Sequence, residues 1–515
     1  MRTGEHPLFI SMSILEKIRP NAGLLGICVL YLISALAVSW NRPPSFDEGW
    51  FASPPYNLIH HGNFGTTTID PRGLFLRSEL THINQRTYWV LPLHLVTQAA
   101  WYSIAGFGLF QMRLLSITFC LLGIAALYYW TLRLTGDRLA AILAGLLVAQ
   151  DNVVVARSVD SRMDWMCLGL GLIAQAAYLY WREKSLSKAI LVSNIVICLS
   201  LLTHPNGIIM ALCLVVTILV LDFRRLRPVH FLWFAAPYAV GAAAYSAYAL
   251  QDMEGFRAQL LGNLASDRVS YIKHPWTAIQ EEAIRYKRIY IGAEYDPGRF
   301  APIKILLLLI WFGGLIGQAY LGRLKSRAAV LLFLCGVIPV VVLTFFNVKN
   351  TYYLIYVIPF FAANAGCFLS FLWHKGFVWK RLAWGILAIA LAVNGALLVK
   401  RLASGRAAYE GYRQTANIAA SLLAPRDRLM APPSFAFAVG MDRVVFDQTL
   451  GFYSHWCPAA LIDYPLSPDE VENLQKYAPD VLNHLNDMKT IYYRPVGEGS
   501  GIYRRIGCPP GGHTN

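Results

Sequence analysis

The sequence has 515 residues, of which 56% are hydrophobic and 15% charged, and its mean hydropathy is +0.44. These values exclude a soluble globular protein. The net charge of +15 does not indicate nucleic-acid binding, because most lysines and arginines stand in the gaps between apolar runs. We therefore expect an all-α polytopic membrane protein.

Long apolar runs divide the chain. A helix that rises about 1.5 Å per residue needs about 20 residues to cross a hydrocarbon core of about 30 Å. The first run continues to Trp40 and is longer than the apolar region of a secretory signal, so we expect it to be retained as a span. In all we predict about eleven transmembrane helices, at 21–40, 113–132, 139–152, 164–180, 188–203, 207–221, 231–250, 302–321, 328–346, 351–373 and 382–399.

Two adjacent acids follow the first span in PSFDEGWF, residues 44–51. Asp47 and Glu48 stand between prolines and the aromatic pair Trp50-Phe51, which holds them near the lipid boundary. Two solvated loop acids are the alternative interpretation. Because an ionised carboxylate at that depth is disfavoured and is usually functional, we treat both as candidate catalytic residues.

Residues 88–108 are apolar and rich in aromatic residues, and we expect an interfacial helix there, within the first external loop, 41–112. With the N-terminus, Lys17 and Arg19 in the cytoplasm, every second loop then carries the positive charge typical of cytoplasmic loops. The first loop, the turn 153–163, the loop 251–300 and all residues after 400 are therefore expected outside. The predicted cytoplasmic loops contain Arg133, Arg138, Arg182, Lys184, Lys188, Arg224, Arg225, Arg227, Arg323, Lys325, Arg327, Lys375, Lys380 and Arg381.

A second acidic motif, ARSVDSRMDW, lies at 156–165 on the external side. Asp160 and Asp164 are four residues apart and would share a helical face, with Arg157 three residues before Asp160. A charge-balanced helix cap is the alternative, and it explains Asp164 at the membrane edge less well than it explains the arginines. Asp164 is a third candidate catalytic residue.

External basic residues are candidates for binding a phosphate. Arg113 opens the second span, where snorkelling to lipid headgroups is the alternative. Lys349 is the one basic residue of the short segment FNVKNTYYLIYVIP, 346–359, and a cation there suits a phosphate near the membrane surface. Carboxylates could take a proton from an acceptor hydroxyl while these cations, with Arg86, stabilise a departing phosphate. The pattern favours transfer of a group from a lipid-linked phosphate.

A multi-span transporter or lipid flippase is the alternative function, because external carboxylates also suit an ion pathway. Coupled transport places ionisable residues near the bilayer midplane. Here the acids stand at the external ends of spans, apart from Asp151, so transport is the weaker interpretation.

The composition changes after residue 400, and 401–515 are predicted to form a small external α/β domain. We expect strands at 443–446 and 490–493, and a helix at 467–485 with Ser467 as its cap and Pro468 in its first position. The nine cysteines include no CxxC pair, so no metal framework built on cysteines is expected. Cys457 and Cys508 fall in the external segment, where they could pair as a disulfide, although no local signal decides it.

The stretch PSFDEGWFASPPYNLIHHGNFGT resembles the first external loop of GT-C glycosyltransferases of the protein O-mannosyltransferase and lipid A aminoarabinose transferase type. Three later stretches are similar to motifs of that family in the same order: QRTYWVLPLHLVTQAAWYSIAGFGLFQMRLLSI, ARSVDSRMD and VKNTYYLIYVIPFFA. The sequence departs from the family where Gln85-Arg86-Thr87 precede the aromatic pair, which puts Arg86 in doubt as a phosphate ligand. It also has a turn at His204 where relatives often have lysine and glycine.

The resemblance implies a GT-C catalytic module at 1–400, a polyprenyl-phosphate-linked sugar as donor, and inversion at the anomeric carbon. We expect a bacterial inner membrane, and the positive charge of the loops predicts a cytoplasmic N-terminus and a periplasmic C-terminal domain. The acceptor, whether glycan, lipid or protein, stays open, as do the sugar and any need for a divalent metal. By position it implies Asp47 as general base, Glu48 as its partner and Asp164 as the second acid, with the donor phosphate held by Arg86, Arg113, Lys349, Tyr352 and, unless it only ends a helix, His204.

Overall fold

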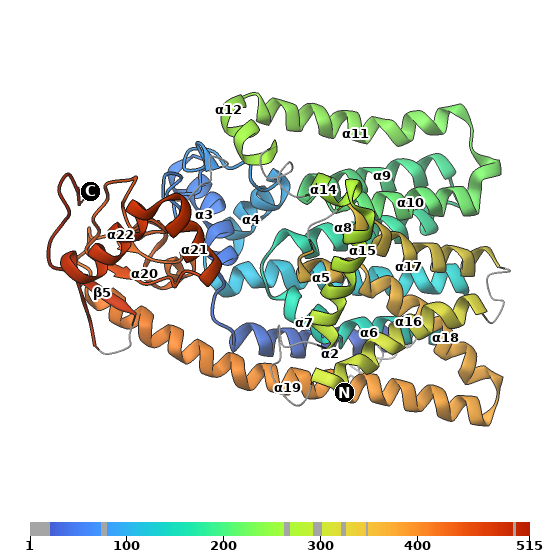
Figure 1. Ribbon diagram of the computed structural model, residues 1–515. Coiled ribbons are helices and arrows are strands. Elements are labelled where there is room, and N and C mark those ends of the chain that lie inside the picture. Colours follow the sequence, from blue (N-terminus) through green and yellow to red (C-terminus); the bar gives the residue numbers. More distant parts are fainter. Residues whose placement is uncertain are drawn as a thin grey trace, which may run out of the picture.

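The computed structural model describes residues 21–73, 80–261, 268–291, 301–320, 326–346, 349–497 and 501–514. Four basic residues of the topology argument lie outside these ranges: Lys17, Arg19, Arg323 and Lys325. So do 262–267 and 292–300 of the predicted external loop 251–300. Figure 1 shows a helical bundle with a smaller domain at one end, joined by one long helix.

Each predicted span falls on a helix of the bundle. Seven helical segments are long and apolar enough to cross a membrane, or eight if the bent pair α6 and α7 forms one span. The chain is thus a multi-span membrane protein. The count of eleven spans stays a prediction, because α6, α8, α11 and α16 are not, each alone, long and apolar enough by the same test. The helices are α2 (Ala22–Trp40), α5 (Leu109–Thr135), α6 (Arg138–Ala149), α7 (Asn152–Ser158), α8 (Met163–Trp181), α9 (Leu186–Thr203), α10 (Gly207–Asp222), α11 (Pro228–Ala249), α16 (Ile305–Tyr320), α17 (Arg327–Phe345), α18 (Ile358–Lys375) and α19 (Phe377–Ser421).

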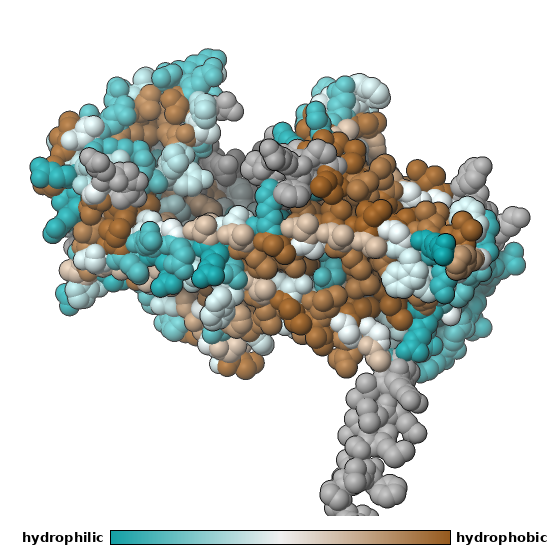
Figure 2. All heavy atoms as spheres, turned by 90° about the horizontal axis from the view of Figure 1, so that it is seen from below, coloured by the Kyte–Doolittle hydropathy of each residue, from teal (hydrophilic) through white to brown (hydrophobic). Residues whose placement is uncertain are grey.

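On the face that Figure 2 shows, hydrophobic residues cover most of the middle of the bundle, the C-terminal domain is of mixed hydropathy, and hydrophilic residues gather at the opposite end. Inside the bundle, small residues let helix backbones approach closely. A Cβ added at Gly169 of α8 would lie 2.5 Å from the carbonyl oxygen of Phe119 in α5. This close crossing fixes the start of α8, where Asp164 stands.

Two helices precede the second predicted span. The acidic pair begins α3 (Phe46–His61), and the predicted interfacial stretch contains α4 (Pro92–Ala105). At 14 residues α4 rises only about 21 Å, which is too short to cross the hydrocarbon core. The expected helix is present, and its position at the interface stays a prediction. Between α11 and α16 the described helices are α12 (Met253–Phe256), α14 (Arg268–Lys273) and α15 (Pro275–Tyr290).

The C-terminal domain contains a five-stranded mixed sheet in the order β2-β1-β3-β5-β4. β1 pairs in parallel with β2 and β3, and β5 pairs antiparallel with β3 and β4. The strand predicted at 443–446 contains β2. The sheet consists of β1 (Leu429–Met430), β2 (Val444–Val445), β3 (Ala460–Ile462), β4 (Tyr493–Pro495) and β5 (Ile502–Arg505), and the domain's helices are α20 (Ala436–Val439), α21 (Pro468–Tyr477) and α22 (Pro479–Asp487).

Two local predictions for this domain were wrong. The strand expected at 490–493 is largely a π-helical turn, Met488–Tyr492, which continues directly from α22. The helix expected at 467–485 divides at Ala478, because the residue before a proline disfavours helical geometry and Pro479 follows it. The cap is confirmed, since Ser467 accepts a hydrogen bond from the backbone of Glu470.

The C-terminal domain is not separate from the segment between α2 and α5. α19 runs through residue 400 without a break, so the proposed division at that residue falls inside one helix. Side chains of α3 and the first loop share a hydrophobic core with the domain, and Ile69 forms a parallel bridge with Phe446. A Cβ added at Gly49 of α3 would lie 2.1 Å from the carbonyl carbon of Pro433, so the helix packs directly on the domain's backbone.

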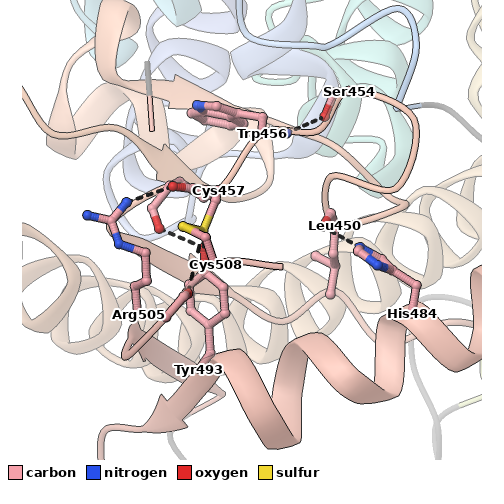
Figure 3. The surroundings of a disulfide bond; sticks show 10 residues. Leu450, Ser454, Trp456, Cys457, His484, Tyr493, Arg505 and Cys508 are labelled. Carbon is pink, nitrogen blue, oxygen red and sulfur yellow. Dashed lines mark hydrogen bonds between the residues drawn. A yellow bond between two sulfur atoms is a disulfide. The ribbon is translucent and has the colours of Figure 1, made fainter. Parts of the chain in front are cut away.

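Cys457 and Cys508 form a disulfide (Figure 3). Around it, Arg505 donates a hydrogen bond to the carbonyl oxygen of Cys457, and the Tyr493 hydroxyl donates one to that of Pro458. The disulfide thus ties the last residues of the chain to the segment before β3. The pairing that the sequence left open is present.

Candidate active site

The acidic pair occupies the first turn of α3, and the local sequence explains why. Ser45 caps the helix by accepting a hydrogen bond from the backbone of Glu48, whose carboxylate accepts one in return from the backbone of Ser45. This reciprocal cap satisfies backbone donors that a helix start leaves unpaired. Successive residues of a helix point about 100° apart, so the cap that turns Glu48 inward leaves Asp47 facing elsewhere.

Glu48 is buried against Arg113 of α5. The carboxylate and the guanidinium form two hydrogen bonds, of 2.8 and 2.9 Å. Arg113 also donates to the carbonyl oxygens of Ser39, Arg42 and Pro43. These contacts occupy all five N–H groups of the guanidinium, so none is left for a phosphate.

Asp47 faces a different arginine. Its carboxylate pairs with Arg162, whose guanidinium also pairs with Asp164 at 3.0 Å. The Asp47 side chain is 29% exposed, whereas that of Asp164 is 5% exposed. One arginine thus joins two of the predicted catalytic acids, one of them open to solvent.

A second set of charges lies beside the first. Asp160 pairs with both Arg42 and Arg157. Burial disfavours the charged form of Asp160, but the two arginines outweigh it and hold the pKa of this carboxyl below its ordinary value. The turn that carries these acids is unusual, because Ser161 is buried and has a positive φ of 41°. Backbone strain of this kind is common at functional sites.

Tyr352 lies against both arginines of the second acidic motif. The guanidinium of Arg157 stands 3.6 Å from the ring centroid, and that of Arg162 stands 4.5 Å from it. The tyrosine comes from the 3-10 helix η7 (Thr351–Tyr356), after Asn350, whose side chain accepts a hydrogen bond from the backbone of Tyr352. The structure therefore brings the second acidic motif, 156–165, together with the segment 346–359.

His204 ends α9 close to this group. Its Nε2 lies 4.0 Å from Oδ1 of Asp164, and its ring packs against Tyr353. Its Nδ1 accepts a hydrogen bond from the backbone of Asn206. The histidine therefore both closes a helix end and faces the buried acid.

Two predicted cations lie elsewhere. Lys349 contacts Glu282 of α15 at 3.2 Å and the carbonyl oxygens of Leu343 and Thr344. Burial lowers the pKa of the Lys349 ammonium, and Glu282 opposes that effect. Arg86 donates to the side chain of Gln251. Within the described ranges neither cation contacts Asp47, Arg162 or Asp164.

Two residues of the site were not singled out from the sequence. Arg162 lies inside the second acidic motif, where the arginines were weighed as part of a helix cap. Arg42 stands two residues after the end of the first span, and no sequence signal connects it with Asp160. Among the residues that the structure describes, no three His, Cys, Asp or Glu side chains are grouped to hold a metal ion.

A polar groove of about 400 Å³ lies where the segment between α2 and α5 meets the C-terminal domain. It is bordered by His61 at the end of α3 and by Asp442 of the domain, whose Nε2 and Oδ1 atoms are hydrogen-bonded at 2.8 Å. Tyr56 of α3 also donates to Asp442, at 2.9 Å. The groove begins about 21 Å along α3 from Asp47, counting 14 residues of helical rise.

No protein-family model matches the sequence, and no curated protein matches it significantly. Several solved structures are similar to the protein in fold. ArnT from Cupriavidus metallidurans in the apo state superposes with a TM-score of 0.59 at 16% identity, over 93% of this chain and 97% of that one. The same protein bound to undecaprenyl phosphate gives 0.57 at 15% identity, over the same shares of the two chains.

This chain has the GT-C fold. The apo oligosaccharyltransferase of Archaeoglobus fulgidus is a further example, with a TM-score of 0.52 at 13% identity over 83% of this chain and 64% of that one. At these identities the likeness concerns the GT-C fold alone. The alignment with ArnT extends over nearly the whole of both chains, so it includes the C-terminal domain as well as the bundle.

Proposed function

We propose that the protein is a membrane glycosyltransferase that moves a sugar from a polyprenyl-phosphate donor to an acceptor hydroxyl on the external face. The observation that carries the proposal is the joining of Asp47 and Asp164 through Arg162, at the start of the first external helix of a GT-C fold. The ArnT structure with undecaprenyl phosphate supports a donor of this class.

In the proposed reaction Asp47 is the general base. The acceptor oxygen attacks the anomeric carbon from the face opposite the phosphate, which inverts that carbon. The bond between the anomeric carbon and the phosphate oxygen breaks, polyprenyl phosphate leaves with the bonding electrons, and the acceptor proton passes to Asp47. The partial exposure of Asp47 suits this role, because an acceptor can reach it.

The departing phosphate needs positive charge close to Asp47. Arg162 and Arg157 meet at the ring of Tyr352, and we propose that these three side chains contact the donor phosphate. His204 remains a candidate through its approach to Asp164. Arg86 and Lys349 contact other residues in this state. They remain candidates only for contacting the donor phosphate before it reaches Asp47 or after the sugar has been transferred.

We assign Glu48 and Arg113 to positioning rather than to substrate contact. Their buried pair uses all the donors of the guanidinium, and it joins the end of α2 to the starts of α3 and α5. In this proposal the pair sets the direction in which Asp47 points.

The proposed orientation has the N-terminus in the cytoplasm and the C-terminal domain outside the inner membrane. The Cys457–Cys508 disulfide supports this, because disulfides persist in oxidising compartments such as the periplasm. The polar groove beside Asp442 supports a polar acceptor without distinguishing a glycan, a lipid headgroup and a protein.

The test is sugar transfer in membranes that carry the wild type, Asp47→Asn or Glu183→Gln, with a panel of labelled polyprenyl-phosphate sugars and total lipid and protein as acceptors. Glu183 is an exposed acid between α8 and α9 and serves as a matched control. We expect transfer by the wild type and by the control, and a loss of at least a hundredfold in Asp47→Asn. Undiminished transfer by Asp47→Asn would remove it as the base, and a wild type that uses no donor would favour transport.

A further inference from the structure

One face of α4 carries three polar side chains. His94, Gln98 and Tyr102 are spaced four residues apart, so they follow one another along the same side of the helix. All three are buried, with exposures of 2%, 0% and 4%. The opposite side of α4 is open, as the 48% exposure of Val96 shows.

Among the described residues, the oxygen and nitrogen of the Gln98 amide and the Tyr102 hydroxyl have no hydrogen-bond partner. The ring nitrogens of His94 make no hydrogen bond of ordinary geometry, but the backbone of Ser161 lies near enough to act on the ring as a hydrogen-bonding group. Buried polar groups in folded proteins are nearly always paired, and each exception calls for an explanation. Exceptions in succession on one helix face make that face a candidate surface for pairing with a bound ligand.

The face extends along the candidate active site. His94 is close enough to Asp164 and Arg162 for their charges to act on it, and Tyr102 stands in the same relation to Glu48. Near its His94 end, the hydroxyl of Ser161 and Oδ1 of Asp164 are also buried without a hydrogen-bond partner in the described chain. The unpaired face therefore lies between the two acidic motifs rather than in a remote part of the bundle.

The chemistry of the face suits hydroxyl groups. Burial lowers the pKa of His94 to about 4, so its imidazole is neutral near pH 7 and offers one donor and one acceptor. The amide of Gln98 and the hydroxyl of Tyr102 also offer both. A phosphate would need positive charge, which the neutral face lacks and the neighbouring arginines supply. Sugar hydroxyls, which donate and accept, match the face.

We propose that the buried face of α4, formed by His94, Gln98 and Tyr102, binds hydroxyl groups of the sugar carried by the donor and so selects which sugar is transferred. The inference rests on the proposed function, because it assigns the two parts of the proposed donor, its phosphate and its sugar, to different parts of the site. The phosphate meets Arg157 and Arg162, and the sugar meets α4. Because the face is covered in this state, α4 has to shift when the sugar enters.

The test compares binding of two lipids to the purified protein: a polyprenyl-phosphate sugar and the same polyprenyl phosphate without the sugar. The variants are Gln98→Leu and His94→Leu, which remove the hydrogen-bonding groups, and Val96→Ala as a control on the open side of the helix. We expect each leucine variant to bind the sugar-bearing lipid at least tenfold more weakly than the wild type and the sugar-free lipid equally well. The control should bind both lipids as the wild type does.

Thermal unfolding of the same variants separates ligand binding from a structural role. Replacing an unpaired buried polar group by an apolar one of similar shape relieves a desolvation cost, so Gln98→Leu should unfold at a higher temperature while losing the sugar. If the leucine variants bind the sugar-bearing lipid like the wild type, or if the wild type does not distinguish the two lipids, the inference is wrong. Sugar-dependent binding without transfer to any acceptor would overturn the proposed function and the selection of a transferred sugar, and would leave only the binding of sugar hydroxyls by α4 in place.

Discussion

Glu48 and Arg113 form a two-point ion pair in which the Nε–Oε1 and Nη2–Oε2 distances are 2.8 and 2.9 Å and both side chains are at most 1% exposed. The pair separates the functions of two neighbouring acids. Glu48 is turned into the protein, and Asp47 is left partly exposed beside Arg162. An acidic pair that looks symmetrical in sequence therefore has one buried and one reachable member.

Breaking this pair should destabilise the protein around the start of α3. Arg113→Ala leaves a buried carboxylate without its partner, and we expect a loss of about 3–5 kcal/mol in unfolding free energy. Arg113→Lys should not restore it, because an ammonium cannot reproduce the five directed donors. Thermal unfolding in detergent measures both, with Arg413→Ala, an exposed arginine of α19, as control. A stable Arg113→Ala protein that no longer binds polyprenyl phosphate would instead favour a phosphate ligand.

Arg162 should be needed for catalysis rather than for stability alone. It contacts Asp47, Asp164 and the ring of Tyr352 at once. Arg162→Lys keeps the charge and loses the planar fork, so we expect a fall of at least tenfold in transfer rate with normal membrane insertion. The comparison is with Arg413→Lys. Equal rates in the two variants would show that the contacts of Arg162 do not bear on the reaction.

The docking of the C-terminal domain on α3 should depend on Gly49. A Cβ there would meet the backbone around Pro433 at 2.1 Å, and backbone cannot move aside as a flexible side chain can. We expect Gly49→Ala to lose at least about 1–3 kcal/mol of stability and to expose the domain to protease. Gly411→Ala in α19, where no atom lies within 4 Å, should be neutral or stabilising. Similar protease resistance in both variants would contradict the close packing of α3 on the domain.

The disulfide should stabilise the C-terminal domain independently of the bundle. Its cysteines are 51 residues apart, and closing a loop of that length corresponds to about 4 kcal/mol in the chain-entropy treatment. Cys457→Ser, or mild reduction, should lower the unfolding temperature of the domain and free the residues after β5 for proteolysis. Cys120→Ser, a free buried cysteine of the bundle, is the control for substitution at a thiol. An unchanged domain in the reduced protein would refute this role.

Stability should fall as the pH is lowered from about 6.5 to about 4, partly because of His94. Burial holds its pKa near 4 in the folded protein, against 6.5 ordinarily, so the unfolded chain takes up a proton first in this range. The charged or titratable groups acting on His94 are Asp164, Arg162 and His204, of which Asp164 alone opposes the lowering. His94→Gln should flatten this part of the pH profile of the unfolding temperature, and an unchanged slope would show that other groups cause it.

Much of the fold could be predicted because it depends on local composition. Apolar length located the helices, and the capping pattern at Ser467 located α21. The partners within the site could not be predicted in the same way, because they depend on which way each side chain points. Lys349 and Tyr352 are three residues apart, yet one contacts Glu282 and the other contacts Arg157.

The role of Arg113 shows the same limit. Its position at the start of a span suggested a lipid or phosphate contact, and only the folded chain brings three backbone carbonyl oxygens and Glu48 around it. The burial of the polar face of α4 could not be predicted from the sequence for a different reason. In sequence, His94, Gln98 and Tyr102 are consistent with an interfacial helix, and their burial depends on the helices packed around them.

Because α19 is one continuous helix, its length sets both the distance and the orientation of the C-terminal domain relative to the bundle. The helix has 45 residues without a break, and each residue adds about 1.5 Å of height and about 100° of rotation. A single residue inserted between the last span and the sheet would therefore swing the whole domain by more than a quarter turn and pull its contacts away from α3. The number of residues in α19, and not only their identity, is thus a condition for the contact between α3 and the C-terminal domain.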